Sequence, residues 1–431
     1  GIENNSFEIS NPLDATLANV SASSIPVDLK INLSESILQK AISLGSGDDI
    51  ITIGDALVAL PAADEIDGGS GSDKLIIDFL GAVTVAPKLS SIEALELHFN
   101  GASTLDFSQT SDISSLEFLS GSADVTLRNV PFDISNLNIS ESQAGAWSIA
   151  YEENAGANVN VVWSNNTPAV VALASMNFDE VKSVSWTLDG SNDVSVDALS
   201  LDADDTNLVS LTNTNDGNLS ISSGAQISTL DALTSISLTS TEGGDVTLGG
   251  VSGGFGISEA PKLSSITLTA SQTGKIELGN IGSSTAAEDL QAISIITSGA
   301  DVALGSIAAE KVGTFTASVA SSAKVSIGPL DFTSAGDSLL FNGSGTFDPI
   351  TFSNEAYKKI DFTDLITDTS VSFANATGSV TLTAGSGSDT ITLGLGPDTV
   401  TGNDGGDIFV VGNGASGITA NTADVITDFK T

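Results

Sequence analysis

Three consecutive nine-residue units run from residue 384 to residue 410, with the sequences AGSGSDTIT, LGLGPDTVT and GNDGGDIFV. In each unit the sixth residue is an aspartate and the eighth is a large apolar residue: Asp389, Asp398 and Asp407, with Ile391, Val400 and Phe409. Extending the register by nine residues on either side adds Leu382 and Ile418 to the apolar series, and places Ser416 where the next aspartate is expected. A strict short repeat of this kind restricts the chain to stacked, nearly identical turns.

The units match the nonapeptide G-G-x-G-x-D-x-U-x, in which glycine-rich turns alternate with the short strands of a parallel β-roll. Glycine lets backbone carbonyls approach an ion closely, and aspartate adds the hard anionic oxygen that Ca²⁺ prefers. Because two units form one coil, Asp389 is expected to meet Asp407 across a shared ion. We therefore predict multiple Ca²⁺ ions, held by the three aspartates and by the carbonyls of Gly385, Gly387 and Gly405. The alternative is a set of Gly/Asp-rich turns without metal.

A second block with the same rhythm lies near the start of the chain. Residues 45–52 (GSGDDIIT) place Asp49 at the ligand position, and residues 68–75 (GGSGSDKL) place Asp73 there. An insertion at 54–63 lies between the two turns and is expected to break their stacking. The expected carbonyl ligands in this block are those of Gly45, Gly47, Gly69 and Gly71. Three further aspartates in D-x-apolar contexts are second choices as ligands: Asp64, Asp424 and Asp428.

Between the two blocks a different repeat appears. Two apolar residues separated by one position are followed about ten residues later by a second such pair, and the unit recurs every 20 to 30 residues. Examples of the first and second pairs are Leu95/Leu97 with Leu105/Phe107, Val184/Trp186 with Val194/Val196, Ile236/Leu238 with Val246/Leu248, Ile266/Leu268 with Ile276/Leu278, and Ile360/Phe362 with Val371/Phe373. Alternation with period two predicts strands, and the longer period predicts coils that cover one another's apolar edges.

These patterns predict an all-β chain that forms one long right-handed parallel β-solenoid, or β-helix, containing calcium β-roll segments. The alternative is a row of tandem β-sandwich domains, because strands spaced ten residues apart also suit sandwiches. The sequence shows neither linkers nor a domain-sized period, which favours the solenoid. The expected segments are a lead-in or cap at 1–43, a calcium-binding segment at 44–80, a degenerate-repeat solenoid at 81–383, and a C-terminal calcium β-roll at 384–431.

Composition limits the partners. The chain has no cysteine, one histidine, and 13 Lys+Arg against 54 Asp+Glu, which gives a formal charge of −41. The absence of cysteine excludes disulfides and cysteine-based zinc sites. Nucleic acids and anionic lipids both need a basic surface, so neither is an expected partner. No apolar run approaches the ~20 residues of a membrane-spanning helix, so no membrane insertion is expected.

An enzyme is the third functional possibility, because parallel β-helices host polysaccharide lyases and hydrolases. A Ser-His-Asp triad would need His98, which alternates with apolar residues of an expected strand and should face outward. Lyases acting on polyuronates need cationic groups, and the only arginine is Arg128. Trp147 and Trp186 fall on strand positions of the repeat, so they are expected to pack in the core or in an interface. Paired carboxylates remain open, since 54 acidic residues offer many pairs. We predict no enzymatic activity.

The organisation of the chain from about residue 44 onward resembles a known family. The run at 384–410 with the tail ADVITDF at 423–429 is common to RTX proteins. The segment GGSGSDKL at 68–75 is followed by SIEALEL at 91–97 and then by hundreds of residues of Ser/Thr/Ala-rich repeats. This arrangement resembles the RTX-type, calcium-dependent surface-layer (S-layer) proteins of Gram-negative bacteria.

The resemblance implies an extracellular structural protein of the bacterial cell surface, exported by type I secretion through a C-terminal signal. Such proteins assemble with copies of themselves into a two-dimensional lattice held by calcium. It also implies anchoring to cell-surface polysaccharide through a part that is not recognised in this chain. The alternative function is an RTX-type adhesin, a fibre that binds a host or another surface without forming a lattice.

Overall fold

In the computed structural model the chain is described over residues 6–36, 38–55, 60, 64–153, 156–164, 171–201, 205–221, 231–249, 256–257, 260–281, 290–310, 312–320, 322–332, 338–352, 359–412 and 422–429. Every regular element within these ranges is a β-strand. The described residues contain no helix with the length and apolar character needed to cross a bilayer. The chain divides into two compact units, Gly1–Asp202 and Ala203–Thr431.

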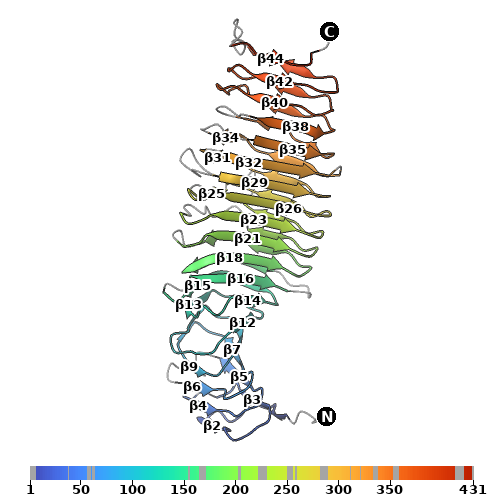
Figure 1. Cartoon of the computed structure of the whole chain (residues 1–431). Coiled ribbons are helices and arrows are strands. Elements are labelled where there is room, and N and C mark those ends of the chain that lie inside the picture. Colours follow the sequence, from blue (N-terminus) through green and yellow to red (C-terminus); the bar gives the residue numbers. More distant parts are fainter. Residues whose placement is uncertain are drawn as a thin grey trace. The chain divides into compact units, whose positions relative to one another are not determined.

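The first unit is a parallel β-solenoid whose coils contribute strands to three sheets (Figure 1). Its first sheet contains β1 (Phe7–Ile9), β3 (Leu29–Leu33), β5 (Ile50–Asp55), β7 (Lys74–Phe79), β10 (Ala94–Phe99), β12 (Ser115–Phe118), β14 (Asn136–Ile139), β16 (Ala157–Trp163) and β18 (Val181–Leu188). The second contains β8 (Thr84–Val85), β11 (Ser103–Asp106), β13 (Val125–Val130), β15 (Gln143–Tyr151), β17 (Val171–Asp179), β19 (Val194–Val196) and β20 (Leu199–Ser200). The third contains β2 (Asn19–Ser21), β4 (Ala41–Ser43), β6 (Glu65–Asp67) and β9 (Lys88–Ser90).

The second unit is built in the same way. Its first sheet contains β21 (Leu208–Asn213), β23 (Ser235–Ser240), β26 (Ser265–Ala270), β29 (Leu290–Thr297), β32 (Val312–Val319), β35 (Ser338–Gly343), β38 (Ile360–Leu365), β40 (Thr381–Thr383), β42 (Thr399–Thr401) and β44 (Val425–Ile426). Its second contains β22 (Leu219–Ile221), β24 (Val246–Leu248), β27 (Ile276–Leu278), β30 (Val302–Leu304), β33 (Lys324–Ile327) and β36 (Thr346–Phe347). Two shorter sheets contain β25 (Gly256–Ile257), β28 (Asn280–Ile281), β31 (Ile307–Ala309) and β34 (Leu330–Phe332), and β37 (Ile350–Thr351), β39 (Ser370–Ser372), β41 (Thr390–Thr392) and β43 (Ile408–Val410).

The apolar pairs of the sequence form the core, as predicted. Leu95 and Leu97 are buried and lie beside Leu116 and Phe118 of the next coil. Strands such as β10, β23 and β26 bury alternate residues, and every described strand pairing is parallel. A sandwich would require antiparallel sheets, so the alternative fold is excluded. Coils stack because each one covers the apolar edge and the unpaired backbone groups of the one before it.

Aromatic side chains also stack from coil to coil inside the first unit. The rings of Phe79 and Phe99 lie 4.3 Å apart and nearly parallel, and Phe118 packs against Trp147 at 4.6 Å. Trp147, Trp163 and Trp186 are all fully buried. The expectation of core packing for Trp147 and Trp186 is therefore confirmed, and none of the three offers a surface to a sugar ring.

The C-terminal repeat first keeps its predicted coil length, and its last described coil is longer than predicted. Leu382 pairs with Val400, and Ile391 pairs with Phe409, so two nonapeptides make one coil. The next coil does not continue through Ser416 and Ile418, which lie outside the described residues. Instead Val400 pairs with Ile426, and Asp424 takes the place expected for Ser416. The sequence register was wrong here because eight extra residues enter the coil before the strand resumes.

Candidate cation sites in the aspartate ladders

The predicted aspartate ligands share one geometry, which we call the aspartate ladder. Each ladder aspartate lies immediately before a short strand, and its Oδ1 accepts the backbone N–H of the corresponding residue one coil earlier. The donor–acceptor pairs are Leu29–Asp49, Lys40–Asp64 and Asp49–Asp73 at 2.7 Å, Thr369–Asp389 at 2.8 Å, Val380–Asp398 and Asp398–Asp424 at 2.9 Å, and Asp389–Asp407 at 3.0 Å. The structure thus brings Asp389 beside Asp407, as the repeat predicted, and it also brings Asp49 beside Asp73, although the insertion at 54–63 was expected to break that stacking.

In the N-terminal ladder the second carboxylate oxygens are left without partners. Asp49 and Asp73 are each 1% exposed, and their Oδ2 atoms make no hydrogen bond to any described residue. Burial raises the pKa of both carboxyls, and for Asp73 the nearby charges of Asp49, Glu93 and Asp48 help to raise the pKa to about 6. Buried carboxylates stacked without a counter-charge are costly, so this ladder calls for a cation or a proton.

Three further acids surround this pair and were missed by the sequence interpretation. The Oε2 atom of Glu93 accepts the N–H of Asp73 at 2.7 Å, so Glu93 continues the ladder by one coil. Asp28 and Asp48 form a parallel row, in which Asp28 accepts the N–H of Asp48 at 3.0 Å and Asp48 accepts that of Ser72 at 2.9 Å. A signal existed for Glu93, since Glu93 and Leu95 repeat the acid-x-apolar rhythm of Asp73 and Leu75.

The predicted glycines are required by the close stacking of the turns. A Cβ atom on Gly45 would lie 1.8 Å from the carbonyl oxygen of Ile25 in the preceding coil. Gly69, Gly71 and Gly405 adopt positive φ angles, which disfavour any side chain. Gly47, Gly385 and Gly387 instead have ordinary φ angles and are required by space alone. The carbonyl of Gly45 accepts the N–H of Ser70 at 2.8 Å, so these carbonyls also hold the turns together.

The C-terminal ladders are better satisfied by the backbone. Asp389 accepts a second hydrogen bond on Oδ2 from Gly385 at 3.2 Å, and Asp398 accepts one from Gly394 at 2.9 Å. Both side chains are buried, and burial raises the pKa of each, against the effect of these amides. The repeat is fuller in this block, yet Asp389 and Asp398 accept hydrogen bonds on both carboxylate oxygens, whereas Asp49 and Asp73 accept them on Oδ1 alone. The N-terminal pair therefore fits a cation more closely.

Asp64 has a different partner. The ammonium group of Lys40 lies 3.6 Å from Oδ2 of Asp64, and both side chains are almost completely buried. The same ammonium donates to the carbonyl of Leu38 at 3.0 Å. Burial lowers the pKa of Lys40 and raises that of Asp64, and their mutual attraction opposes both shifts. Lys40 supplies the positive charge for which the sequence predicted a metal ion at Asp64. We therefore do not propose Asp64 as a metal ligand.

The last described coil ends in an acidic hollow of about 500 Å³, which Asp404, Asp407 and Asp428 help to line. The carboxylate of Asp428 accepts the N–H groups of Gly402 at 3.0 Å and Asn403 at 2.6 Å. Asp428 therefore closes the turn of the preceding coil. Its second-choice role as a metal ligand stays a prediction.

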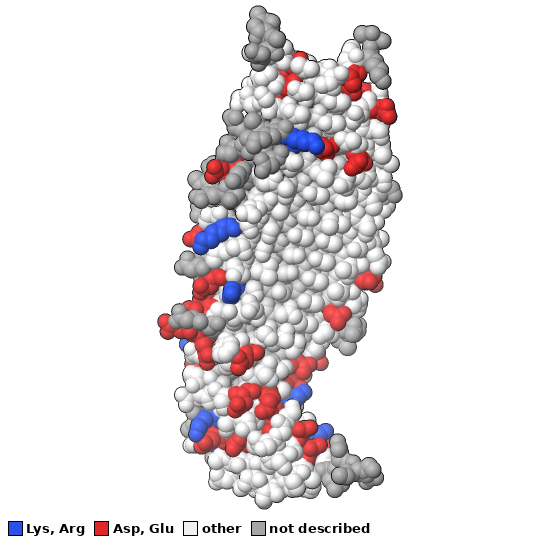
Figure 2. All heavy atoms as spheres, in the orientation of Figure 1, with Lys and Arg blue, Asp and Glu red and all other residues white. Residues whose placement is uncertain are grey.

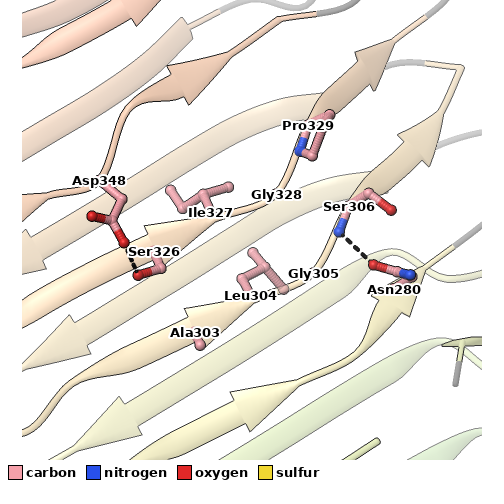
Figure 3. Close-up of a pocket in the computed structure, with 10 residues that line it drawn as sticks. All are labelled: Asn280, Ala303, Leu304, Gly305, Ser306, Ser326, Ile327, Gly328, Pro329 and Asp348. Atoms are coloured by element: carbon pink, nitrogen blue, oxygen red, sulfur yellow. Dashed lines mark hydrogen bonds between the residues drawn. The ribbon is translucent and has the colours of Figure 1, made fainter. Parts of the chain in front are cut away.

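A separate hollow of about 440 Å³ lies over β30 and β33 (Figure 3). Among its described lining residues the only carboxylate is that of Asp348, which accepts a hydrogen bond from the hydroxyl of Ser326 and forms an ion pair with Lys324 at 2.8 Å. Hydrolysis of glycosides requires two carboxyl groups across the scissile bond, so this hollow gives no support to the enzyme alternative. His98 faces outward on β10, as predicted, with its ring nitrogens 3.7 Å from carboxylate oxygens of Asp78 and Glu96.

The kind of ion that fits the N-terminal ladder depends on the ligand atoms available there. Within the described residues, no three histidine, aspartate or glutamate side chains converge as a metal cluster. A cation in the N-terminal ladder would be held by the unpaired oxygens of Asp49 and Asp73 together with backbone carbonyls of the glycine turns. Carboxylate and carbonyl oxygens of this kind suit Ca²⁺, which accepts flexible oxygen coordination. In comparisons with family models, curated proteins and solved structures, nothing matches this chain.

Proposed function

We propose that this chain is a calcium-stabilised structural protein of the S-layer type, which assembles with copies of itself into a two-dimensional lattice on the outside of a bacterial cell. The single observation that carries the proposal is the N-terminal aspartate ladder. Asp49 and Asp73 are buried beside each other with unpaired oxygens, in a chain whose formal charge is −41. Solenoid coils that stack buried carboxylates in this way need a cation or a proton to offset the charge.

Calcium is the cation proposed, with Asp49, Asp73, Asp389, Asp398 and Asp407 as side-chain ligands. When bound, the ion supplies positive charge and links consecutive glycine turns, so that its binding free energy adds to the stability of the coils. Export by type I secretion and a place at the cell surface are carried over from the family resemblance. The parallel solenoid supports a structural role, since its ladders repeat along the coil axis, and the hollow over β30 and β33 has a single carboxylate among its described lining residues.

The test uses the purified full chain, moved from chelator into millimolar calcium, with magnesium as the comparison ion. Bound calcium is measured by equilibrium dialysis, thermal stability by circular dichroism, and assembly by electron microscopy. Calcium, and not magnesium, is expected to raise the unfolding temperature and to produce ordered sheets. The double variant Asp49→Asn/Asp73→Asn should lose bound calcium and much of the stabilisation, whereas Asp133→Asn, which changes an exposed aspartate outside the ladders, should behave like the wild type.

Two results would count against the proposal in different ways. If calcium changes neither stability nor the amount of bound metal, the ladder carboxylates are neutralised by protons and held by hydrogen bonds, without a metal ion. If calcium stabilises the chain and yet no sheets form at any concentration, the cation sites survive and the adhesin alternative replaces the lattice.

A further inference from the structure

The outward face of the first sheet in the second unit carries three straight rows of side chains on strands β21, β23, β26, β29, β32 and β35. Alternate residues of these strands are buried, so the residues between them face out. The rows are Leu208–Ser235–Ser265–Ala292–Thr314–Ser338, Ser210–Ser237–Thr267–Ser294–Thr316–Leu340, and Thr212–Thr239–Thr269–Ile296–Ser318–Asn342. We call these eighteen residues the hydroxyl face, since thirteen of them are serine or threonine.

The hydroxyl face contains no charged residue, although 54 of the 431 residues of the chain are acidic. Figure 2 shows its centre as a broad area without coloured side chains. Some outward positions of the first sheets elsewhere are charged, namely Lys74 and Glu96 in the first unit and Asp361 on the next strand, β38, whereas the outward residues of β40 and β42 are threonines. Other sheets of the second unit carry Glu277 and Lys324 on their outward positions. The uncharged area therefore spans all six strands of the hydroxyl face, while charged residues lie on the adjoining strand β38 and on another sheet of the same unit.

The hydroxyl groups of this face are available to an outside partner. Thr314 donates to the backbone carbonyl of Gln291 at 3.2 Å, and no other hydroxyl of the face is hydrogen-bonded to a described residue. A hydroxyl both donates and accepts, so a regular array of hydroxyls is complementary to a second copy of itself. Within each row, successive side chains lie one strand apart, which is about 4.8 Å. A second copy of the chain has the same spacing.

We propose that the hydroxyl face is a contact surface for a second copy of this chain, an inference that rests on the proposed assembly. Acidic surfaces of two copies repel, whereas two neutral faces approach without bringing carboxylates together. Six strands of six residues cover about 500 Å² by strand geometry, less than the ~800 Å² per partner of a stable isolated complex. The face therefore acts as one of several contacts in an array, and is too small to hold an isolated dimer in dilute solution.

The experiment places a charge at the centre of the face in the full chain. Thr267→Glu and Thr267→Lys each put a charge into the middle row, and Thr247→Glu puts one on β24 of the second sheet, at a similarly half-buried outward position. Calcium-dependent stability is measured by circular dichroism, and the assembled fraction by sedimentation and electron microscopy. Both Thr267 variants should keep the calcium-dependent rise in unfolding temperature and lose assembly at least about tenfold, while Thr247→Glu assembles like the wild type.

Three outcomes would overturn the inference. Assembly of both Thr267 variants at the wild-type level would place the contacts elsewhere and leave the proposed function intact. If the wild type binds calcium but never assembles, the face is not a contact for a second copy, and the proposed lattice is also wrong. A wild type that stays monomeric and sediments with an insoluble neutral polysaccharide, in a way that Thr267→Glu abolishes, would assign the face to a glycan surface.

Discussion

At the scale of single residues, Asp73 is a carboxyl group whose ionisation is opposed both by burial and by neighbouring negative charges. Its pKa is raised from 3.8 to about 6, first by burial and then by the neighbouring carboxylates. The folded state then binds this proton more tightly than the unfolded state, so without metal the resulting stability is fully present below pH 3.8 and is lost as the pH rises through about 6. At 1.36 kcal/mol per unit the difference is roughly 3 kcal/mol.

We therefore expect the chain in chelator to be more stable at pH 5 than at pH 7. Urea unfolding at the two pH values measures this difference, and Asp73→Asn should remove much of it, because an amide carries no titrating proton. In saturating calcium the trend should weaken or reverse, since protons then compete with the ion. Equal pH dependence of Asp73→Asn and the wild type in chelator would contradict the assignment.

Lys40 and Asp64 allow a second test at this scale. Lys40→Met leaves the buried Asp64 carboxylate without its cation, and Asp64→Asn leaves the buried ammonium without its anion, so each should cost about 3–5 kcal/mol of unfolding free energy. The double variant should recover most of that loss. These costs should be similar in calcium and in chelator. A loss of one bound calcium in Asp64→Asn would show instead that Asp64 is a metal ligand.

The limits of sequence reasoning at the residue scale have physical causes. The repeat placed Asp389 beside Asp407 because a strict register fixes which residues stack, whereas the insertion at 54–63 hid the stacking of Asp49 on Asp73. The repeat did not predict the contact between Lys40 and Asp64, because their pairing depends on a coil of irregular length. The repeat also assumed that every ladder needs a metal, whereas backbone N–H groups satisfy several of the carboxylates in part.

At the scale of elements, the turns depend on the absence of side chains where coils touch. Gly45→Ala would place a methyl group 1.8 Å from the carbonyl oxygen of Ile25, so the backbones must separate. Overpacking of this kind costs typically about 1–3 kcal/mol or more. Gly406→Ala is the matched change in a turn, because its methyl group would lie no closer than 3.6 Å to Oγ of Ser388, and it should cost within ~0.5 kcal/mol. Thermal unfolding compares the two, and equal losses would show that stacking contacts do not limit the turn.

The strands were the most predictable elements. Alternating pairs such as Ile236/Leu238 and Ile266/Leu268 identified both the strands and their stacking partners, because burial on one face enforces a period of two. The short sheets around β4 and β31 were not predicted, since strands of two or three residues carry too little pattern. The skip before Ile426 was also missed, because an insertion in a loop leaves no trace in the apolar register.

At the scale of the whole molecule, the aspartate ladders occur in some coils only, whereas the apolar core continues through coils with and without them. The aspartate ladders involve β3, β5 and β7 near one end of the sequence and β40 to β43 near the other. The coils between them have continuous apolar cores, for example Ile236, Ile266 and Ile293, and contain none of the ladder aspartates. In a solenoid each coil contacts only its neighbours, so loss of metal should act locally.

Hydrogen exchange in chelator and in calcium tests this division. Removal of calcium should speed exchange of backbone amides in β5 and β7 and in β40 to β42, while amides of β23, β26 and β29 keep their protection. Far-UV circular dichroism should accordingly lose only part of its strand signal. Asp49→Asn/Asp73→Asn in calcium should reproduce the faster exchange in β5 and β7 and leave β40 to β42 unchanged. Uniform loss of protection along the chain would mean that the coils unfold as one cooperative unit, and that the terminal ladders determine the stability of all of them.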